Sequence, residues 1–152
     1  MELKRVLQGI EGIKAKGDLE IDVKDITNDS RNVKKGSMFI AIKGFETDGH
    51  KYISDVIEKG PSAIMVEEGT DLKVFAGVEG ITILVAPNTR QALAIASSNF
   101  YGNPSHKLKL IGVTGTKGKT TTTYMIKEML EKQGKKVRLN WNYCCIYKWQ
   151  KT

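Results

Sequence analysis

Residues 108–130, LKLIGVTGTKGKTTTTYMIKEML, constrain the fold of this chain more than any other stretch. The segment opens with a short apolar run bounded by glycine, which predicts a buried strand. A turn rich in glycine and threonine follows, and apolar residues at helical spacing from Met125 to Leu130 predict a helix that begins close to Lys119. A strand, a glycine-rich turn and a helix that starts with Lys-Thr form the layout of a phosphate-binding loop.

The residue types of this turn suit a bound phosphate. Glycines let the backbone curl so that consecutive N–H groups point at phosphate oxygens, and the helix N-terminus adds a partial positive charge. Lys119 would reach the β- and γ-phosphates of a nucleotide, and the Thr120 hydroxyl would bind Mg²⁺. The strict pattern requires glycine at position 113, where this chain has valine. The alternative interpretation is a glycine turn with an incidental exposed lysine.

Length and composition favour a soluble globular protein. The 152 residues suffice for one ordinary domain, or for one small domain and a piece of another. No apolar run approaches the length of a membrane span and the N-terminus lacks a signal-peptide core, so a cytoplasmic location is expected. The two cysteines, Cys144 and Cys145, are adjacent, which is not the spacing of a zinc or redox pair, so free thiols are expected.

The net charge of +7 is unevenly distributed. Residues 1–108 carry 14 Lys and Arg against 15 Asp and Glu, whereas residues 109–152 carry 10 against 2. The basic segment could bind nucleic acid, with its aromatic residues stacked on bases. A nucleotide-phosphate site that lacks its acidic partners explains the same excess. Nucleic acid is the less favoured partner, because the glycine loop would then have no role.

Upstream of the loop, strand and helix patterns alternate. Apolar runs or alternation predict strands over 19–27, 38–42, 63–66 and 81–85. Helical spacing predicts helices over 2–8 and 52–57, and a third that begins at an Asn88 cap with Gln91 as its capping-box partner and ends before Gly102. One more strand is expected at 135–139.

A short proline-containing linker, residues 102–106, predicts a domain boundary. Residues 1–105 would form a complete small α/β domain. Residues 106–152 would form the first strand, phosphate loop and helix of a parallel-sheet domain that is incomplete, because one or two parallel strands cannot bury themselves.

Two separated motifs resemble the Mur ligase superfamily, and they follow one another along the chain in the order that the family has. Gly115-Thr116-Lys117-Gly118-Lys119-Thr120-Thr121 resembles its ATP loop, usually written GTNGKTT, with Lys117 where asparagine is usual. Residues 29–44 and Asp48-Gly49-His50 resemble the DSR-to-DGH pattern of its N-terminal domain, with Lys35 in place of the usual proline. The resemblance covers roughly residues 20–138. His50, at a helix start, is expected to hydrogen-bond to the backbone.

The resemblance implies part of an ATP-dependent ligase of peptidoglycan precursors. In that family the N-terminal domain holds the uridine diphosphate of the substrate. Ser30 matches the substrate-contacting position, and Arg31 would either pair with the diphosphate or brace the turn. Residues 115–121 would bind ATP, with Lys119 as the catalytic residue and Thr120 as the Mg²⁺ ligand.

Among members of the family, the arrangement is most similar to the ligase that adds the third amino acid to UDP-N-acetylmuramoyl-L-alanyl-D-glutamate. ATP would phosphorylate the D-glutamate carboxylate, and an amine would attack the acyl phosphate. A monomer without membrane contact is expected. The amino acid that is added stays undetermined, because the family's amino-acid-binding domain is not in this sequence.

Residues 139–152, LNWNYCCIYKWQKT, change the character of the sequence. They show neither clean periodicity nor the family's glycine-rich continuation. A frameshifted or truncated reading frame with a non-native tail is favoured over an aromatic tail packed on the helix. The family's acidic Mg²⁺ ligands are missing, so this chain alone is expected to be inactive. A phosphate-loop small-molecule kinase stays as an alternative, although it would need an acidic Mg²⁺ ligand after a further apolar strand.

Overall fold

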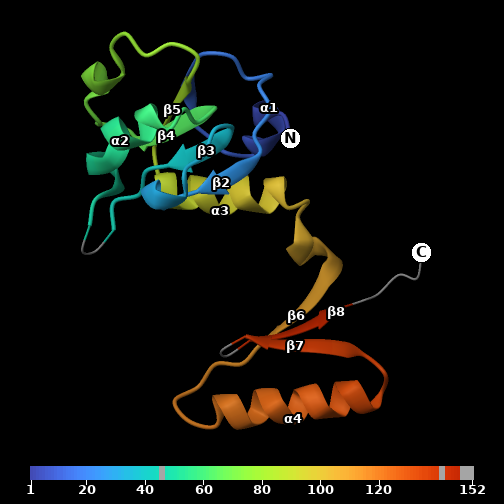
Figure 1. Ribbon diagram of the computed structural model, residues 1–152. Coiled ribbons are helices and arrows are strands. Elements are labelled where there is room, and N and C mark those ends of the chain that lie inside the picture. Colours follow the sequence, from blue (N-terminus) through green and yellow to red (C-terminus); the bar gives the residue numbers. More distant parts are fainter. Residues whose placement is uncertain (45–46, 141–142, 148–152) are drawn as a thin grey trace. The chain divides into compact units, whose positions relative to one another are not determined.

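The computed structural model describes residues 1–44, 47–140 and 143–147 (Figure 1). The chain divides into two compact units, Met1–Gly102 and Asn103–Thr152. Of the predicted tail, residues 141–142 and 148–152 lie outside the described residues.

The first unit is built around a five-stranded sheet of strand order β1-β5-β4-β3-β2. β2 to β5 are parallel neighbours, and β1 pairs antiparallel with β5 at one edge. The strands are β1 (Lys14–Lys16), β2 (Asp25–Thr27), β3 (Ser37–Ile40), β4 (Ala63–Glu67) and β5 (Thr82–Ala86). The α-helices are α1 (Leu3–Val6), α2 (Ile53–Glu58) and α3 (Thr89–Phe100), and the 3₁₀ helices are η1 (Ser30–Asn32), η2 (Gly49–Tyr52) and η3 (Leu72–Phe75).

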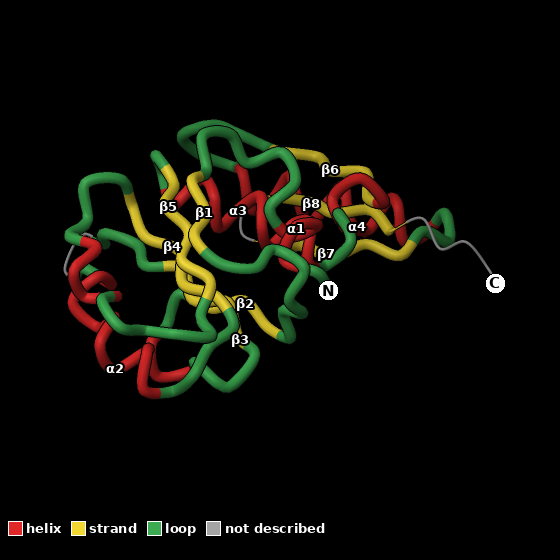
Figure 2. Tube along the Cα trace, turned by 90° about the horizontal axis from the view of Figure 1, so that it is seen from above, coloured by secondary structure: helices red, strands yellow, loops and turns green. Residues whose placement is uncertain are grey.

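Apolar side chains cover both faces of this sheet. Met38 and Ile40 of β3 belong to a buried cluster with α1 and α3, whereas Phe39 between them packs with α2. Because side chains alternate along a strand, a continuous apolar run is what a strand covered on both faces needs. Figure 2 shows α2 and α3 on opposite sides of the strands. The unit is therefore α/β, as predicted, and the structure adds that its helices and sheet form three layers.

The two edge strands differ from the sequence prediction. The strand expected over 19–27 is confined to β2, because the residues before it run along α1. There the Leu3 and Lys4 N–H groups donate to the carbonyls of Ile21 and Leu19, both at 2.9 Å. The apolar alternation of this stretch therefore reflects packing under α1 and not sheet pairing. β1 carries no apolar signal, because all three of its residues are exposed.

Side-chain caps mark the starts of α3 and of the 3₁₀ helix η2. The Asn88 side chain accepts a hydrogen bond from the Gln91 N–H at 2.9 Å, which confirms the predicted cap of α3. The predicted helix over 52–57 is present as η2 followed directly by α2. Asp48 caps η2 by accepting from the His50 N–H at 3.0 Å.

The second unit is a three-stranded sheet of order β6-β8-β7 with one long helix. Its elements are η4 (Pro104–Lys107), β6 (Leu108–Gly112), α4 (Lys119–Lys132), β7 (Lys136–Asn140) and β8 (Tyr143–Tyr147). β8 pairs antiparallel with both neighbours, so β6 and β7 run in the same direction on either side of it. The two predicted strands are confirmed, but the pairings between them are antiparallel, through a strand that the sequence did not indicate.

The expected burial of β6 is wrong for this unit. Leu110 is 58% exposed, and Leu108 and Ile111 are only half-buried. The register puts Ile111 and Leu139 on one face and Leu110 with Arg138 on the other. Since the first pair is half-buried and the second exposed, α4 covers the first face. A β6 buried on both sides would need a second covering layer.

Within the described residues, no helix is long and apolar enough to cross a membrane.

Candidate functional site

A cavity of about 640 Å³ in the first unit contains the residues predicted to bind substrate. Its walls come from the η1 turn, the chain that follows β3, and the start of α3. Its volume is typical of small-molecule sites. The lining residues are Asn28, Asp29, Ser30, Arg31, Ile42, Gly44, Thr47, Gly49, Tyr52, Arg90 and Leu93.

The η1 turn holds Ser30 in the cavity wall. The Asp29 carboxylate caps the turn by accepting from the Arg31 N–H at 3.0 Å. On the other side, the Lys59 ammonium, next to the end of α2, donates to the Ser30 carbonyl at 2.6 Å. The backbone at Ser30 is thus fixed from two directions, which presents its half-buried side chain from a defined position.

Arg31 braces the turn. Its Nε donates to both Asp29 carboxylate oxygens at 3.0 and 3.2 Å, and its Nη2 donates to Oδ2 at 2.7 Å. These side-chain bonds, with that from the Arg31 N–H, lower the pKa of Asp29 to about 2 and raise the pKa of Arg31. The bracing alternative is therefore observed. Pairing of Arg31 with a diphosphate stays a prediction. The Arg31 side chain is 87% exposed, but its guanidinium already pairs with the Asp29 carboxylate.

His50 hydrogen-bonds to the backbone, as expected. Its Nδ1 lies 2.6 Å from Asp48 Oδ1, and its Nε2 accepts from the Glu67 N–H at 3.1 Å. The backbone and side-chain bonds from His50 lower the pKa of Asp48. The adjacent Gly49 lines the cavity, and a side chain there would be crowded, since a Cβ would lie 3.0 Å from both the N and O of Ile42.

Five residues of the cavity lie outside the motifs used for prediction: Asn28 and Thr47, which are next to the motifs in sequence, and Tyr52, Arg90 and Leu93. Tyr52, which is 39% exposed, offers an aromatic face, and Leu93 adds apolar surface. Arg90 adds a guanidinium from the first turn of α3, where its Nη2 donates to the Lys43 carbonyl at 3.0 Å. A basic residue in the first helical turn opposes the helix dipole, and that is the one sequence signal that could have identified it.

In the second unit, residues 113–118 connect β6 to α4, and the predicted residues 115–121 run from this loop into the first turn of α4. Gly115 and Gly118 have positive φ angles of 152° and 77°, which side chains with a Cβ rarely adopt. α4 begins at Lys119, and its N-cap Gly118 makes no side-chain cap bond among the described residues. The first N–H groups of the helix therefore point from an uncapped N-terminus with no acidic residue in its first turn.

Lys119 is anchored inside the loop, because its Nζ donates to the Gly115 carbonyl at 2.6 Å. Thr116, Lys117, Thr120 and Thr121 are exposed around it. Thr120 offers a hydroxyl in the first turn, which suits one position of a Mg²⁺ otherwise held by phosphate and water. The described residues contain no cluster of three His, Cys, Asp or Glu side chains that could hold a metal by itself.

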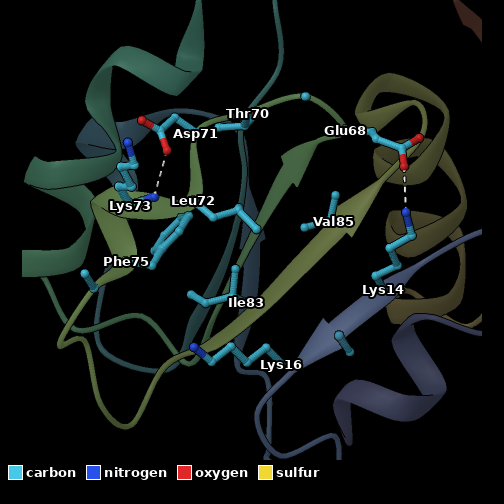
Figure 3. A pocket seen from close by; sticks show the side chains of 13 residues that line it. Lys14, Lys16, Glu68, Thr70, Asp71, Leu72, Lys73, Phe75, Ile83 and Val85 are labelled. Carbon is cyan, nitrogen blue, oxygen red and sulfur yellow. Dashed lines mark hydrogen bonds and ion pairs between the residues drawn. The ribbon is translucent and has the colours of Figure 1, made fainter.

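A second cavity of the first unit, about 670 Å³ in volume, contains none of the predicted residues (Figure 3). Phe75, Ile83 and Val85 form an apolar floor. At its rim Lys14 pairs with Glu68 at 2.7 Å, which lowers the pKa of Glu68. Since its floor is apolar and its residues lie outside the predicted motifs, we place the candidate site in the cavity beside Ser30.

Two models of known protein families match this chain, one within the first unit and one within the second. Residues 22–101, more than half of the chain, match the family model described as Mur ligase family, catalytic domain. The chain belongs to the Mur ligase family. Residues 113–151 match the Mur ligase middle domain, which begins inside the glycine loop segment.

Two similar curated proteins carry the same name. A UDP-N-acetylmuramoyl-L-alanyl-D-glutamate–2,6-diaminopimelate ligase of Clostridium tetani is 51% identical over 139 residues, and one of Clostridioides difficile is 47% identical. In each case the match covers 91% of this chain but 28% of the relative. The chain therefore spans a little more than a quarter of the length of these Mur ligases.

A solved structure shares the fold of this Mur ligase chain. The UDP-N-acetylmuramoylalanyl-D-glutamyl-2,6-diaminopimelate–D-alanyl-D-alanyl ligase of Acinetobacter baumannii matches with a TM-score of 0.56 and 30% sequence identity. The match covers 86% of this chain and 27% of that one. The α/β fold class predicted from the sequence is thereby confirmed.

Proposed function

We propose that the chain binds a UDP-N-acetylmuramoyl-dipeptide in the cavity beside Ser30 and ATP at the loop before α4. The observation that carries this proposal is the 51% identity, over 91% of the chain, to a relative named for ligation of 2,6-diaminopimelate to UDP-N-acetylmuramoyl-L-alanyl-D-glutamate. Since the chain spans only 28% of that relative, we assign it the two binding steps. Ligation itself is proposed for a protein of the relatives' full length, acting in the cytoplasm as a monomer.

The cavity has the chemistry for a sugar nucleotide. Tyr52 and Leu93 supply an aromatic and an apolar surface for a base, and Ser30 supplies a hydroxyl that can donate to an oxygen without desolvating a charge. Arg31 supplies positive charge at the same wall. A UDP-linked substrate contains a base, a diphosphate and sugar hydroxyls, which these three kinds of group would bind.

The loop has the chemistry for a nucleotide triphosphate. Backbone N–H groups at the start of α4 would bind phosphate oxygens, and Lys119 would exchange its bond to the Gly115 carbonyl for the β- and γ-phosphates. Thr120 would contribute its hydroxyl to a Mg²⁺ ion, which neutralises phosphate charge when bound. In ligation the loop would hold the γ-phosphate during its transfer to the D-glutamate carboxylate, where an acyl phosphate forms for attack by an amine.

Calorimetry on the full chain tests both binding steps separately. Ser30→Ala should lower the affinity for UDP-N-acetylmuramoyl-L-alanyl-D-glutamate by about fivefold to tenfold, as expected for one lost hydrogen bond, and leave the affinity for ATP unchanged. Lys119→Ala should lower the affinity for ATP by about a hundredfold and leave the affinity for the sugar nucleotide unchanged. Lys127→Ala is the matched control, because Lys127 lies on the same helix and faces Glu131 at 3.9 Å.

No heat with either ligand at millimolar concentration would refute the proposal. Binding of single-stranded nucleic acid that falls steeply with salt, in place of ATP binding, would instead support a basic nucleic-acid module.

A further inference from the structure

Arg90 joins the cavity from a part of the chain that no motif marks. It is the second residue of α3, and it lines the same cavity as Ser30 and Arg31, which come from η1 some sixty positions earlier. The Arg31 guanidinium is already committed to a carboxylate through three hydrogen bonds. The contacts of Arg90 include a bond of 3.0 Å from its Nη2 to the Lys43 carbonyl.

The Lys43 contact orients Arg90 at a known point of the cavity wall. Lys43 lies just before Gly44, which also lines the cavity. A bond to a carbonyl fixes the plane of the guanidinium while its positive charge is retained. Such a planar cation, in a helical turn whose N–H groups also favour anions, is suited to phosphate oxygens.

A chain of hydrogen bonds holds this helical turn in place. The Glu67 carboxylate, at the end of β4, accepts from the N–H and the hydroxyl of Thr89, both at 3.2 Å. The Glu67 N–H in turn donates to His50 Nε2 at 3.1 Å. Thr89 is completely buried, so its hydroxyl depends on this carboxylate for its hydrogen bond. His50 thus reaches the residue next to Arg90 through Glu67.

His50 can accept this bond only while its Nε2 carries no proton. Asp48 Oδ1 lies 2.6 Å from Nδ1, which selects the tautomer with the proton on Nδ1 and the lone pair on Nε2. The imidazole is 14% exposed and does not line the cavity. An effect of His50 on binding can pass through Glu67 to α3, or through Asp48 to Gly49 and Tyr52 of η2, which also line the cavity. Only the first route would make the effect depend on Arg90.

We propose that Arg90 binds the diphosphate of the sugar nucleotide, and that His50 is a positioning residue that acts on it through Glu67 and Thr89. This inference rests on the proposed function of the cavity. It adds to that function the residue that distinguishes a nucleoside diphosphate from a nucleoside.

The experiment compares UDP with uridine as probes, by calorimetry or ligand-detected NMR on the full chain. Arg90→Met should lower the affinity for UDP by about tenfold to a hundredfold, which corresponds to a lost charged hydrogen bond. The affinity for uridine should change by less than about twofold. Arg5→Met is the matched control, since Arg5 has the same side chain in the same unit but pairs with Glu2 on α1. It should change neither affinity.

A double-mutant cycle tests the positioning role. His50→Leu should lower the affinity for UDP by about threefold to tenfold, but should cause no further loss of affinity in the Arg90→Met background. His50→Gln should restore most of the affinity, because its amide oxygen can accept from the Glu67 N–H while its amide nitrogen donates to Asp48. Circular dichroism establishes that each variant is folded, and Arg90→Met, at an exposed position, tests the diphosphate contact even if His50→Leu does not fold.

Each result has a distinct meaning. Equal losses of UDP and uridine affinity in Arg90→Met would overturn the diphosphate contact. Losses that add in the double variant, or a His50→Gln variant as weak as His50→Leu, would overturn the positioning role. If the unsubstituted chain binds neither probe, the proposed function of the cavity falls, and this inference falls with it. Binding of both probes with no effect of Arg90→Met would overturn this inference alone.

Discussion

The two units differ in how completely the apolar side chains of their sheets are buried. In the first, Met38 and Phe39 are neighbours in β3 that point to opposite faces, and both are fully buried because helices cover both sides of the sheet. In the second, Leu110 is 58% exposed on a sheet that has α4 on one face only. The outer side of α4 also exposes Met125 and Met129, at 64% and 65%. Layers on both faces, and not strand pairing alone, therefore separate the two units.

This difference extends to the candidate sites. The cavity beside Ser30 rests on groups from η1, the end of α2, the chain after β3 and α3, which pack on the two faces of one sheet. The loop before α4 is fixed mainly by its own glycine conformations and by the Lys119 bond to Gly115. A site held by a packed core is preorganised before the ligand arrives, whereas a site on a thinly covered unit gains more order from its ligand.

Hydrogen exchange should reveal the largest difference between the units. Backbone amides of β4, at the centre of the first sheet, should exchange about a thousandfold more slowly than those of β6, which corresponds to about 4 kcal/mol of opening free energy. β4 is covered on both faces, whereas β6 exposes Leu110. Mass spectrometry of peptides from 63–67 and 108–112 gives the comparison in a single sample. Equal protection would show that the second unit is covered in solution, for instance by a second copy of the chain.

Side-chain truncation should show the next largest difference. Phe39→Ala removes a fully buried ring and should lower the free energy of unfolding by about 3–5 kcal/mol. Met129→Ala, the control on α4, removes a side chain that is 65% exposed and should change it by less than about 0.5 kcal/mol. Urea unfolding followed by circular dichroism measures both. A loss at Met129 as large as that at Phe39 would contradict the view that the outer face of α4 is uncovered.

The sequence predicted best where local and long-range forces agree. The helix start at Lys119 and the cap at Asn88 are local features, because glycine conformation and side-chain capping act within a few residues. The central strands were also predictable, since a run such as residues 38–42 is apolar on both alternating faces. Ser30 and Arg31 came from a motif, and the structure places them in one cavity with the residues that follow β3.

The sequence failed where burial depends on distant partners. The apolar residues Leu19 and Ile21 are spaced as in a strand, but their carbonyls accept hydrogen bonds from N–H groups of α1. No local sequence pattern predicts that contact. Arg90 joins the cavity only because α3 begins beside the chain that follows β3. Burial of β6 was expected from its apolar residues, but apolar composition does not supply the layer that must cover them.

The smallest predicted effect concerns how the first site is held before a ligand arrives. Arg31→Gln should raise the pKa of Asp29 from about 2 toward its ordinary value of 3.8, because the charged side-chain hydrogen bonds are lost. The rise should be incomplete, since the backbone N–H of residue 31 still donates to the carboxylate and Lys59 still lies near. A carbon-detected NMR titration of the Asp29 carboxyl measures the shift, with Arg5→Gln as the control.

The sign of the effect on the turn follows from this pKa. A depressed folded-state pKa means that the ionised Asp29 stabilises η1 fully above pH 3.8, and that this contribution is lost as the pH falls through about 2. In Arg31→Gln the loss should occur closer to pH 3.8. An unchanged value in that variant would mean that the capping N–H alone holds the carboxylate. Arg31 would then not be needed to brace the turn, and the diphosphate would become its better partner.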